Sequence, residues 1–221
     1  MKLFAWIVLM APMAFAAPKV GRSTEKSSAP VIKANLAGLK VYGVMDMADT
    51  FDFNRSISAN GQSQSESGNF ASERTFGAGA VYTFARLEKG IGLQGGGSFE
   101  LGRAISSQKV ANATVPFQGA KPEIQFWTAF GQATANLTPE LAVYGGGNYS
   151  IPQVKNIAGG TWKGGFGYQF GASYDITQAL ALAGEYRTLN MSGTVDQNGV
   201  STNYDKISLQ GFSIRAMYAF E

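Results

Sequence analysis

Apolar and polar residues alternate along much of the chain with a period of two. The clearest stretch is residues 162–174, where every second position from Trp162 to Tyr174 is an aromatic residue, glycine or alanine. The positions between them hold lysine, glutamine, serine and glycine. Successive side chains of a β-strand point to opposite faces, so the pattern predicts a strand with one apolar face and one small or polar face.

The same alternation predicts eight strands. Residues 124–137 fit least well, because Phe126 and Phe130 fall on the polar face of that segment. Either a β-bulge resets the phase there, or the two rings fill the interior of the fold. The predicted strands span residues 39–48, 74–85, 91–102, 124–137, 141–149, 162–174, 180–188 and a C-terminal segment that runs to Phe220.

The links between these strands alternate in length. Outer-membrane barrels combine short periplasmic turns with long extracellular loops. Outside the N-terminal region, no segment reaches the roughly 20 apolar residues of a transmembrane helix. We therefore expect an all-β fold, an eight-stranded antiparallel up-and-down transmembrane β-barrel with both ends on the periplasmic side. Short links lie at 87–90, 138–140 and 177–179, and long, polar links lie at 49–73, 103–123, 150–161 and 190–205.

The N-terminus indicates export. Lys2 precedes an apolar run from Leu3 to Met13, and Ala14-Phe15-Ala16 offers the small-x-small pattern of a signal peptidase site. We expect a signal peptide at 1–16, a flexible periplasmic leader at 17–33 and the barrel at 34–221. The predicted location is the outer membrane of a Gram-negative bacterium. The chain has no cysteine, which excludes disulfides, thiolate metal sites and a lipid-bearing cysteine after the signal.

Composition agrees with a membrane barrel and argues against nucleic acid as a partner. Charged residues make up 15% of the chain, against about 25% in a soluble domain. The formal net charge is +3, which is too small to favour a polyanion. A soluble lipocalin-like carrier would place its polar faces in water, and those faces are here mostly glycine and serine.

Several stretches resemble known small outer-membrane barrels. They are Phe126–Gly131 continuing through Asn136–Leu141, the motif Gly184–Arg187 and the ending Gly211–Phe220. The chain is similar to the eight-stranded superfamily of the opacity proteins and of the membrane domain of outer-membrane protein A. Val41–Asp46 also resembles the first strand of general porins, although the chain is too short for sixteen strands.

The resemblance implies a set of partners and an assembly signal. In these families the last strand, with a glycine and alternating hydrophobic residues up to a terminal aromatic, is recognised by the barrel assembly machinery. Glu221 departs from that pattern, because phenylalanine is usually the last residue. We also expect contacts with periplasmic chaperones and outer-membrane lipids. The residues that match the signal are Gly211, Ile214, Ala216, Tyr218 and Phe220.

Nothing in the sequence predicts catalysis. The chain has no histidine, whereas outer-membrane barrel enzymes, by resemblance, generally use a histidine base. No paired carboxylates occur at a recognisable spacing, and zinc sites built on His or Cys are excluded. We expect no enzymatic activity, no cofactor and no metal site.

The candidate site is a set of charges on the face that points into the barrel. An eight-stranded barrel has an interior that side chains can fill, and a charge buried there is unfavourable unless it is paired. We predict a contact between Glu185 and Arg215, with Arg187 and Asp46 as the neighbouring pair. The network is either a static polar core or a gate that opens a narrow pore. Its predicted members are Lys40, Asp46, Glu100, Lys163, Glu185, Arg187 and Arg215.

Aromatic residues near the predicted strand ends indicate membrane-interface girdles. A sugar-binding platform would instead need these rings in the long links, which are poor in aromatics. The first long link, 49–73, is rich in Ser, Asn and Gln and predicts a mobile, solvated surface loop. The predicted girdle residues are Tyr82, Phe84, Trp127, Tyr149, Trp162, Tyr174, Tyr218 and Phe220.

Two classes of function remain open. One is a barrel with a largely side-chain-filled polar lumen that has a structural or surface-interaction role through long extracellular loops, whose ligand the sequence does not identify. The other is a narrow pore or small-molecule transport across the outer membrane, including a site for small hydrophobic compounds. The presence or absence of ion conductance separates a plugged barrel from a pore.

Overall fold

The computed structural model describes residues 38–87, 90–111, 113–117 and 119–220. In this part of the chain no helix is long and apolar enough to span a membrane. The predicted signal peptide and leader lie outside the described residues. The strands are β1 (Gly38–Asp46), β2 (Thr50–Ala59), β3 (Gln62–Ser72), β4 (Thr75–Arg86), β5 (Ile91–Glu100), β6 (Arg103–Val110), β7 (Ala113–Pro116), β8 (Glu123–Asn136), β9 (Leu141–Lys155), β10 (Gly160–Asp175), β11 (Leu180–Gln197) and β12 (Val200–Ala219).

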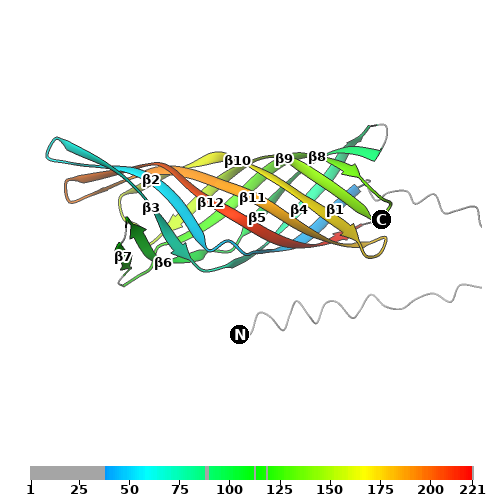
Figure 1. Ribbon diagram of the computed structural model, residues 1–221, viewed down its shortest axis with the longest axis horizontal. Coiled ribbons are helices and arrows are strands. Elements are labelled where there is room, and N and C mark those ends of the chain that lie inside the picture. The colour runs from blue at the N-terminus through cyan, green and yellow to red at the C-terminus, as the bar shows by residue number, and fades with distance from the viewer. Residues whose placement is uncertain (1–37, 88–89, 112, 118, 221) are drawn as a thin grey trace, which may run out of the picture. The chain divides into compact units, whose positions relative to one another are not determined.

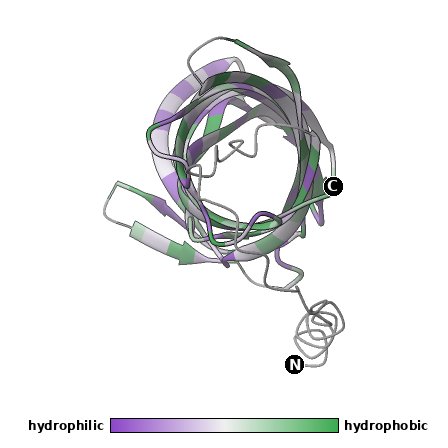
Figure 2. Ribbon diagram, turned by 90° about the vertical axis from the view of Figure 1, so that its right-hand side faces the viewer, coloured by the Kyte–Doolittle hydropathy of each residue, from purple (hydrophilic) through white to green (hydrophobic). Residues whose placement is uncertain are grey.

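These strands form eight barrel strands. Three of the eight are interrupted, so that β1 continues as β2, β3 as β4 and β5 as β6, while β7 pairs only with β6. All neighbours are antiparallel, and β1 pairs with β12 from Lys40↔Ala219 to Asp46↔Ser213, which closes the sheet. Seen along the barrel, the strands form one ring (Figure 2). The predicted eight-stranded up-and-down barrel is confirmed.

The two ends of the barrel differ (Figure 1). At the terminal end, β1 begins, β12 finishes and the short links follow β4, β8 and β10. Two of these links have the same construction. Thr138 Oγ1 accepts hydrogen bonds from the backbone N–H groups of Glu140 and Leu141. Thr177 Oγ1 accepts them from those of Ala179 and Leu180. At the hairpin end, β2–β3 and β11–β12 turn through Asn60-Gly61 and Asn198-Gly199, all with positive φ. Asn-Gly is the preferred pair for such tight hairpins.

The outer surface carries an apolar belt, as a barrel in a membrane requires. Phe166 is 80% exposed and Phe212 is 66% exposed, although both are large and apolar. Trp162, predicted to join the aromatic girdle, is instead turned inward and packs near Tyr204 with ring centroids 5.8 Å apart. Other exposed members of the belt are Leu39, Phe76, Tyr82, Phe84, Trp127, Tyr149, Ile151, Tyr168, Phe170, Tyr174, Leu180, Leu182, Ile214, Tyr218 and Phe220.

The predicted long links are mostly strand, and this corrects the sequence interpretation. Residues 49–73 contain β2 and β3, and their rings Phe51, Phe53 and Phe70 are buried. The sequence hides this alternation because the inward positions change from even to odd numbers. Asp46 and Ala48 point inward before the interruption between β1 and β2 ends, and Phe51 and Phe53 point inward after it. An extra residue in a strand moves every later side chain to the opposite face. The 49–73 segment is therefore part of the barrel wall.

The interior is layered along the barrel. At the terminal end an apolar cluster includes Phe130 and Met217, and toward the hairpin end a larger one includes Phe51 and Phe126. Both Phe126 and Phe130 therefore fill the interior, which is one of the two alternatives left open by the sequence. Because the larger cluster is apolar, the predicted polar lumen is wrong at the hairpin end. Between the two clusters, on β1, β8, β11 and β12, the inward side chains are charged or polar.

We expect Gly96→Ala to destabilise the barrel by about 1–3 kcal/mol, because overpacking forces the backbone or neighbouring side chains to shift. A β-carbon at Gly96 would lie 2.3 Å from the carbonyl oxygen of Ala80 and 2.6 Å from Phe130 Cζ. The control is Gly131→Ala, where a β-carbon meets nothing within 4 Å. That change should be neutral or stabilising by about 0.4–1 kcal/mol. Urea unfolding in lipid vesicles measures both, and equal stabilities would contradict the prediction.

Candidate functional site: a buried charge layer and a cavity

Four buried charges form the centre of the interior. Arg103 donates hydrogen bonds to Asp46 Oδ2 at 3.0 Å and to Glu100 Oε2 at 2.8 Å. Arg187 donates to the same Asp46 oxygen at 2.9 Å and forms an ion pair with Glu100 Oε1 at 2.5 Å. Each arginine therefore contacts both carboxylates, and all four residues are at most 3% exposed.

A second buried pair lies beside these four residues. Arg215 donates a hydrogen bond to Glu185 Oε1, so the contact predicted between these two residues is present. The guanidinium carbon of Arg215 lies 4.7 Å from the ring centroid of Tyr42 and 5.5 Å from that of Phe130. These cation–π contacts join the pair to the apolar cluster at the terminal end.

We call these six residues the charge layer: Asp46, Glu100, Arg103, Glu185, Arg187 and Arg215. Three guanidinium groups face three carboxylates, so the formal charges of the layer cancel. Burying an unpaired ion in a barrel would cost several kcal/mol, whereas a matched set with directed hydrogen bonds offsets that penalty. The layer has an apolar cluster on each side along the barrel.

Two of the predicted network residues lie elsewhere. Lys40 points inward but pairs with Asp175 at the terminal end, where the two charged atoms are 3.8 Å apart. Lys163 is exposed on the outer face, so its predicted place in the lumen is wrong. The reason is an irregularity in β10 between Gly165 and Gln169, which carries one more residue than β11 opposite it. Beyond that point, Trp162 and not Lys163 points inward.

Arg103 is the charge-layer residue that sequence reasoning missed. It lay in a predicted loop, and an odd-numbered position should face outward when Glu100 faces inward. The interruption at residues 101–102 changes the phase, so Glu100 and Arg103 both point inward and form a contact. No pattern in the sequence marks this change.

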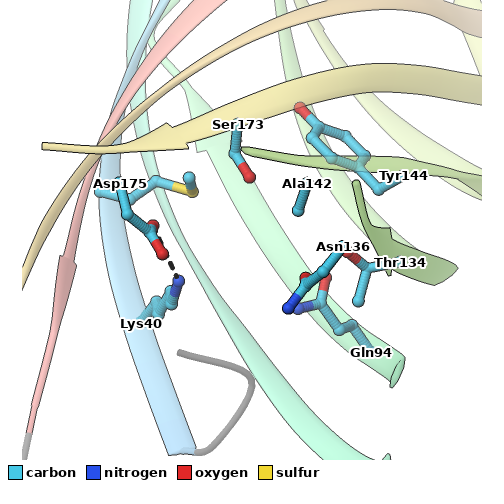
Figure 3. A pocket seen from close by; sticks show the side chains of 9 residues that line it. Lys40, Gln94, Thr134, Asn136, Ala142, Tyr144, Ser173 and Asp175 are labelled. Atoms are coloured by element: carbon cyan, nitrogen blue, oxygen red, sulfur yellow. Dashed lines mark ion pairs between the residues drawn. The ribbon is translucent and has the colours of Figure 1, made fainter. Parts of the chain in front are cut away.

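A chain of amide hydrogen bonds crosses the interior on the terminal side of the layer. Gln169 donates to Gln132 at 2.7 Å, Gln132 donates to Gln94 at 2.8 Å, and Gln94 donates to Thr83 at 3.2 Å. Next to Gln94 a polar pocket of about 40 Å³ opens at the terminal end. Figure 3 shows Lys40 and Asp175 on one side of this pocket and Gln94, Asn136 and Thr134 on another. Its volume suits a few waters and no larger ligand.

The larger cavity lies at the hairpin end and has a volume of about 320 Å³. We call it the hairpin-end cavity. Aromatic and aliphatic side chains dominate its wall, and none of its lining residues is charged. The lining residues are Phe70, Ile105, Gln108, Phe117, Ala120, Pro122, Ile124, Asn156, Ile157, Trp162, Val195, Gln197, Thr202, Tyr204 and Ile207.

A seam in the barrel wall runs beside this cavity. The pairing of β9 with β10 ends at Ser150↔Gly165, so residues 151–155 and 160–164 are not paired with each other. Pro152 lies in this part of β9, and a proline has no N–H to donate to a neighbouring strand. The link beyond the seam is held by other contacts, since Asn156 Nδ2 donates to Lys121 O at 2.9 Å and Gln197 Nε2 donates to Ala158 O at 2.8 Å.

No protein-family model and no curated protein sequence matches the chain. The solid-state NMR structure of outer membrane protein AlkL in DMPC lipid bilayers matches with a TM-score of 0.51 and 14% identity, covering 92% of this chain and 97% of that one. The chain has the fold of the small eight-stranded outer-membrane β-barrel proteins. Crystal structures of OprG from Pseudomonas aeruginosa (TM-score 0.49, 14% identity, 81% of this chain and 96% of that one) and of Neisserial surface protein A (TM-score 0.36, 14% identity, 81% and 97%) also match.

Four residues of the expected assembly signal lie in the last part of β12, and Phe220 directly follows the strand. Ile214, Tyr218 and Phe220 are exposed in the apolar belt, and Ala216 shares their face. Gly211 lies against Ala48, where a β-carbon would come within 2.5 Å of the alanine Cβ. Recognition by the assembly machinery and by chaperones stays a prediction.

We expect Glu185→Leu to destabilise the barrel by about 3–5 kcal/mol, because it leaves Arg215 buried without its carboxylate. The double variant Glu185→Leu/Arg215→Met removes both charges and should recover most of that loss. Urea unfolding in vesicles measures all three proteins. A double variant as unstable as the single one would show that the ion pair is not the source of the effect.

The control for this series is an exposed ion pair on the outer surface. Lys155 Nζ lies 3.2 Å from Glu123 Oε1, with 58% and 34% of the two side chains exposed. Glu123→Ala should change the stability by about 1 kcal/mol or less, because solvent screens such pairs.

Proposed function

We propose that this protein is an outer-membrane barrel that does not conduct ions and that binds small, neutral, largely apolar molecules in the hairpin-end cavity. The observation that carries this proposal is the lining of the cavity, which is aromatic and aliphatic with no charged side chain. Ligand sites are typically cavities of about 300–1,000 Å³ with apolar walls and a few polar groups. Here Gln108, Asn156, Gln197 and Thr202 can supply hydrogen bonds that orient a ligand.

The charge layer supports the non-conducting part of the proposal. It fills the barrel with paired side chains just below the larger apolar cluster, so a molecule in the cavity meets a closed floor. By the rule that outer-membrane barrels keep short turns on the periplasmic side, the hairpin end faces the cell exterior. The seam between β9 and β10 borders the cavity through Trp162 and offers access from the side of the barrel.

A surface-interaction role through long loops has less support. Residues 49–73 and 190–205 are largely in β2, β3, β11 and β12, and their inward side chains pack in the barrel. The described links at the hairpin end are short, and the exposed surface there belongs to the β2–β3 and β11–β12 hairpins, which project beyond the other strands (Figure 1).

Planar-bilayer recordings test the closed lumen. We expect the purified wild-type protein to give no conductance steps, because six paired charges and two apolar clusters fill the interior. Steady single-channel steps from the wild-type protein would contradict the closed barrel and favour the narrow-pore alternative.

Tryptophan quenching tests the ligand site. In a Trp6→Phe/Trp127→Phe background, Trp162 is the remaining tryptophan and reports on the cavity. The neutral aromatic quencher 1-bromonaphthalene should quench it in a saturable way. Thr202→Phe fills part of the cavity and should weaken binding about tenfold, a change of 1.4 kcal/mol. The control is Ser201→Phe, because adjacent residues of a strand face opposite sides. Quenching that rises with membrane partitioning and never saturates would refute the site.

A further inference from the structure

Three barrel strands are interrupted at the same level. The interruptions are residues 47–49 between β1 and β2, 73–74 between β3 and β4, and 101–102 between β5 and β6. Backbone hydrogen bonds connect these interruptions to neighbouring strands. Ser72 N of β3 donates to Asp49 O at 2.7 Å, and Glu73 N donates to Ala104 O of β6 at 3.1 Å. The regular pairing of three neighbouring strands therefore stops along one line across the wall.

Beyond this line, β2, β3, β6 and β7 form a separate piece of sheet, which we call the lobe. One edge of the lobe is firmly attached, because β2 pairs with β12 from Val200↔Ala59 to Leu209↔Phe51. The other edge has fewer attachments, because β6 meets β8 in two pairs, Arg103↔Ile124 and Ala104↔Glu123, followed by one backbone hydrogen bond from Ile105 N to Pro122 O at 2.8 Å. A piece of sheet held along one edge can turn about that edge when few contacts restrain the other.

The lobe supplies one wall of the hairpin-end cavity. Phe70 of β3, Ile105 and Gln108 of β6, and Phe117 after β7 line it from the lobe. The opposite wall comes from β10, β11 and β12, with Trp162 and Ile207 among its residues. Movement of the β6–β7 side of the lobe therefore changes the width of the cavity.

Arg103 holds the loose edge of the lobe to the rest of the barrel. It is the first residue of β6, and its side chain is fully buried. Its guanidinium donates to Ala48 O at 3.1 Å, in the first interruption, as well as to Asp46 of β1 and Glu100 of β5. The three acceptors lie outside the lobe. Arg215 shares the charge layer but contacts Glu185, Tyr42 and Phe130, none of which lies in an interruption or in the lobe.

We propose that the lobe swings about its β2–β12 edge, that Arg103 is the latch that restrains it, and that this motion sets how fast a ligand enters and leaves the hairpin-end cavity. The inference rests on the proposed function for its ligand, but the motion itself is a property of the free protein. Arg103 is thus a positioning residue: it restrains the lobe that forms one wall of the cavity.

Distance measurements between spin labels test the motion without any ligand. The chain has no cysteine, so Val115→Cys on β7 and Thr161→Cys on β10, both exposed, can be labelled without other substitutions. In lipid nanodiscs we expect a narrow distance distribution for this pair, and a broader one shifted to longer distances when Arg103→Ala is added. Arg215→Ala, the matched control, should leave the distribution narrow. Superimposable distributions with and without Arg103→Ala would overturn the latch.

A disulfide tests the motion where Arg103→Ala does not fold. Ala104 and Glu123 are paired residues of β6 and β8, so Ala104→Cys/Glu123→Cys can close the loose edge. We expect 1-bromonaphthalene to leave the oxidised protein about tenfold more slowly than the reduced protein, since changes within one binding site appear mainly in the dissociation rate. Equal rates in the two forms would overturn the proposal. Absence of binding in the reduced form would refute the proposed function instead, and the spin-label distances would still decide whether the lobe moves.

Discussion

The rest of the structure depends on the neutrality of the charge layer. Three arginines and three carboxylates from β1, β5, β6, β11 and β12 lie between two apolar clusters, and removing any one of them leaves the layer with one uncompensated buried charge. An apolar core of equal volume is often as stable as such a network. The layer therefore matters less as a source of stability than as a constraint on arrangement. The hydrogen bonds form only when the five strands have this register.

The phase changes in the strands explain why the barrel has a second, apolar interior. Below the interruptions, inward positions on β1 and β5 are even-numbered, and they end at Asp46 and Glu100. Beyond them, odd-numbered positions such as Phe51 and Ile105 point inward. Irregular pairing in β10 and β12 has the same effect on Trp162 and Tyr204. The wall at the hairpin end thus presents rings and aliphatic side chains to the hairpin-end cavity. Two edges of this wall are incompletely paired, β6 with β8 and β10 with β9.

The charge layer and the apolar cavity are the two features on which the proposed function rests. In that proposal ions do not pass, because the guanidinium and carboxylate groups of the layer are paired with each other. A neutral apolar molecule, by contrast, gains from leaving water for a wall of Phe70, Trp162 and Tyr204. The interruptions lie beside the lobe that supplies one wall of the cavity, and Arg103 connects the lobe to β1 and β5. The two proposals, ligand binding and lobe motion, therefore meet at one side chain.

The sequence by itself determined the class of fold, because a period of two with one apolar face leaves few structures other than a membrane barrel, and the alternating links gave the correct number of strands. It also predicted the Glu185–Arg215 contact, since the two residues lie on neighbouring strands at similar distances from the end where the short links are. Only the tertiary structure decided that 49–73 is wall and not loop, that Lys163 faces outward and that Arg103 belongs to the charge layer. Each of these depends on where an extra residue enters a strand. Such a residue reverses the faces that follow it, and the strands opposite it, distant in sequence, determine where it can be accommodated.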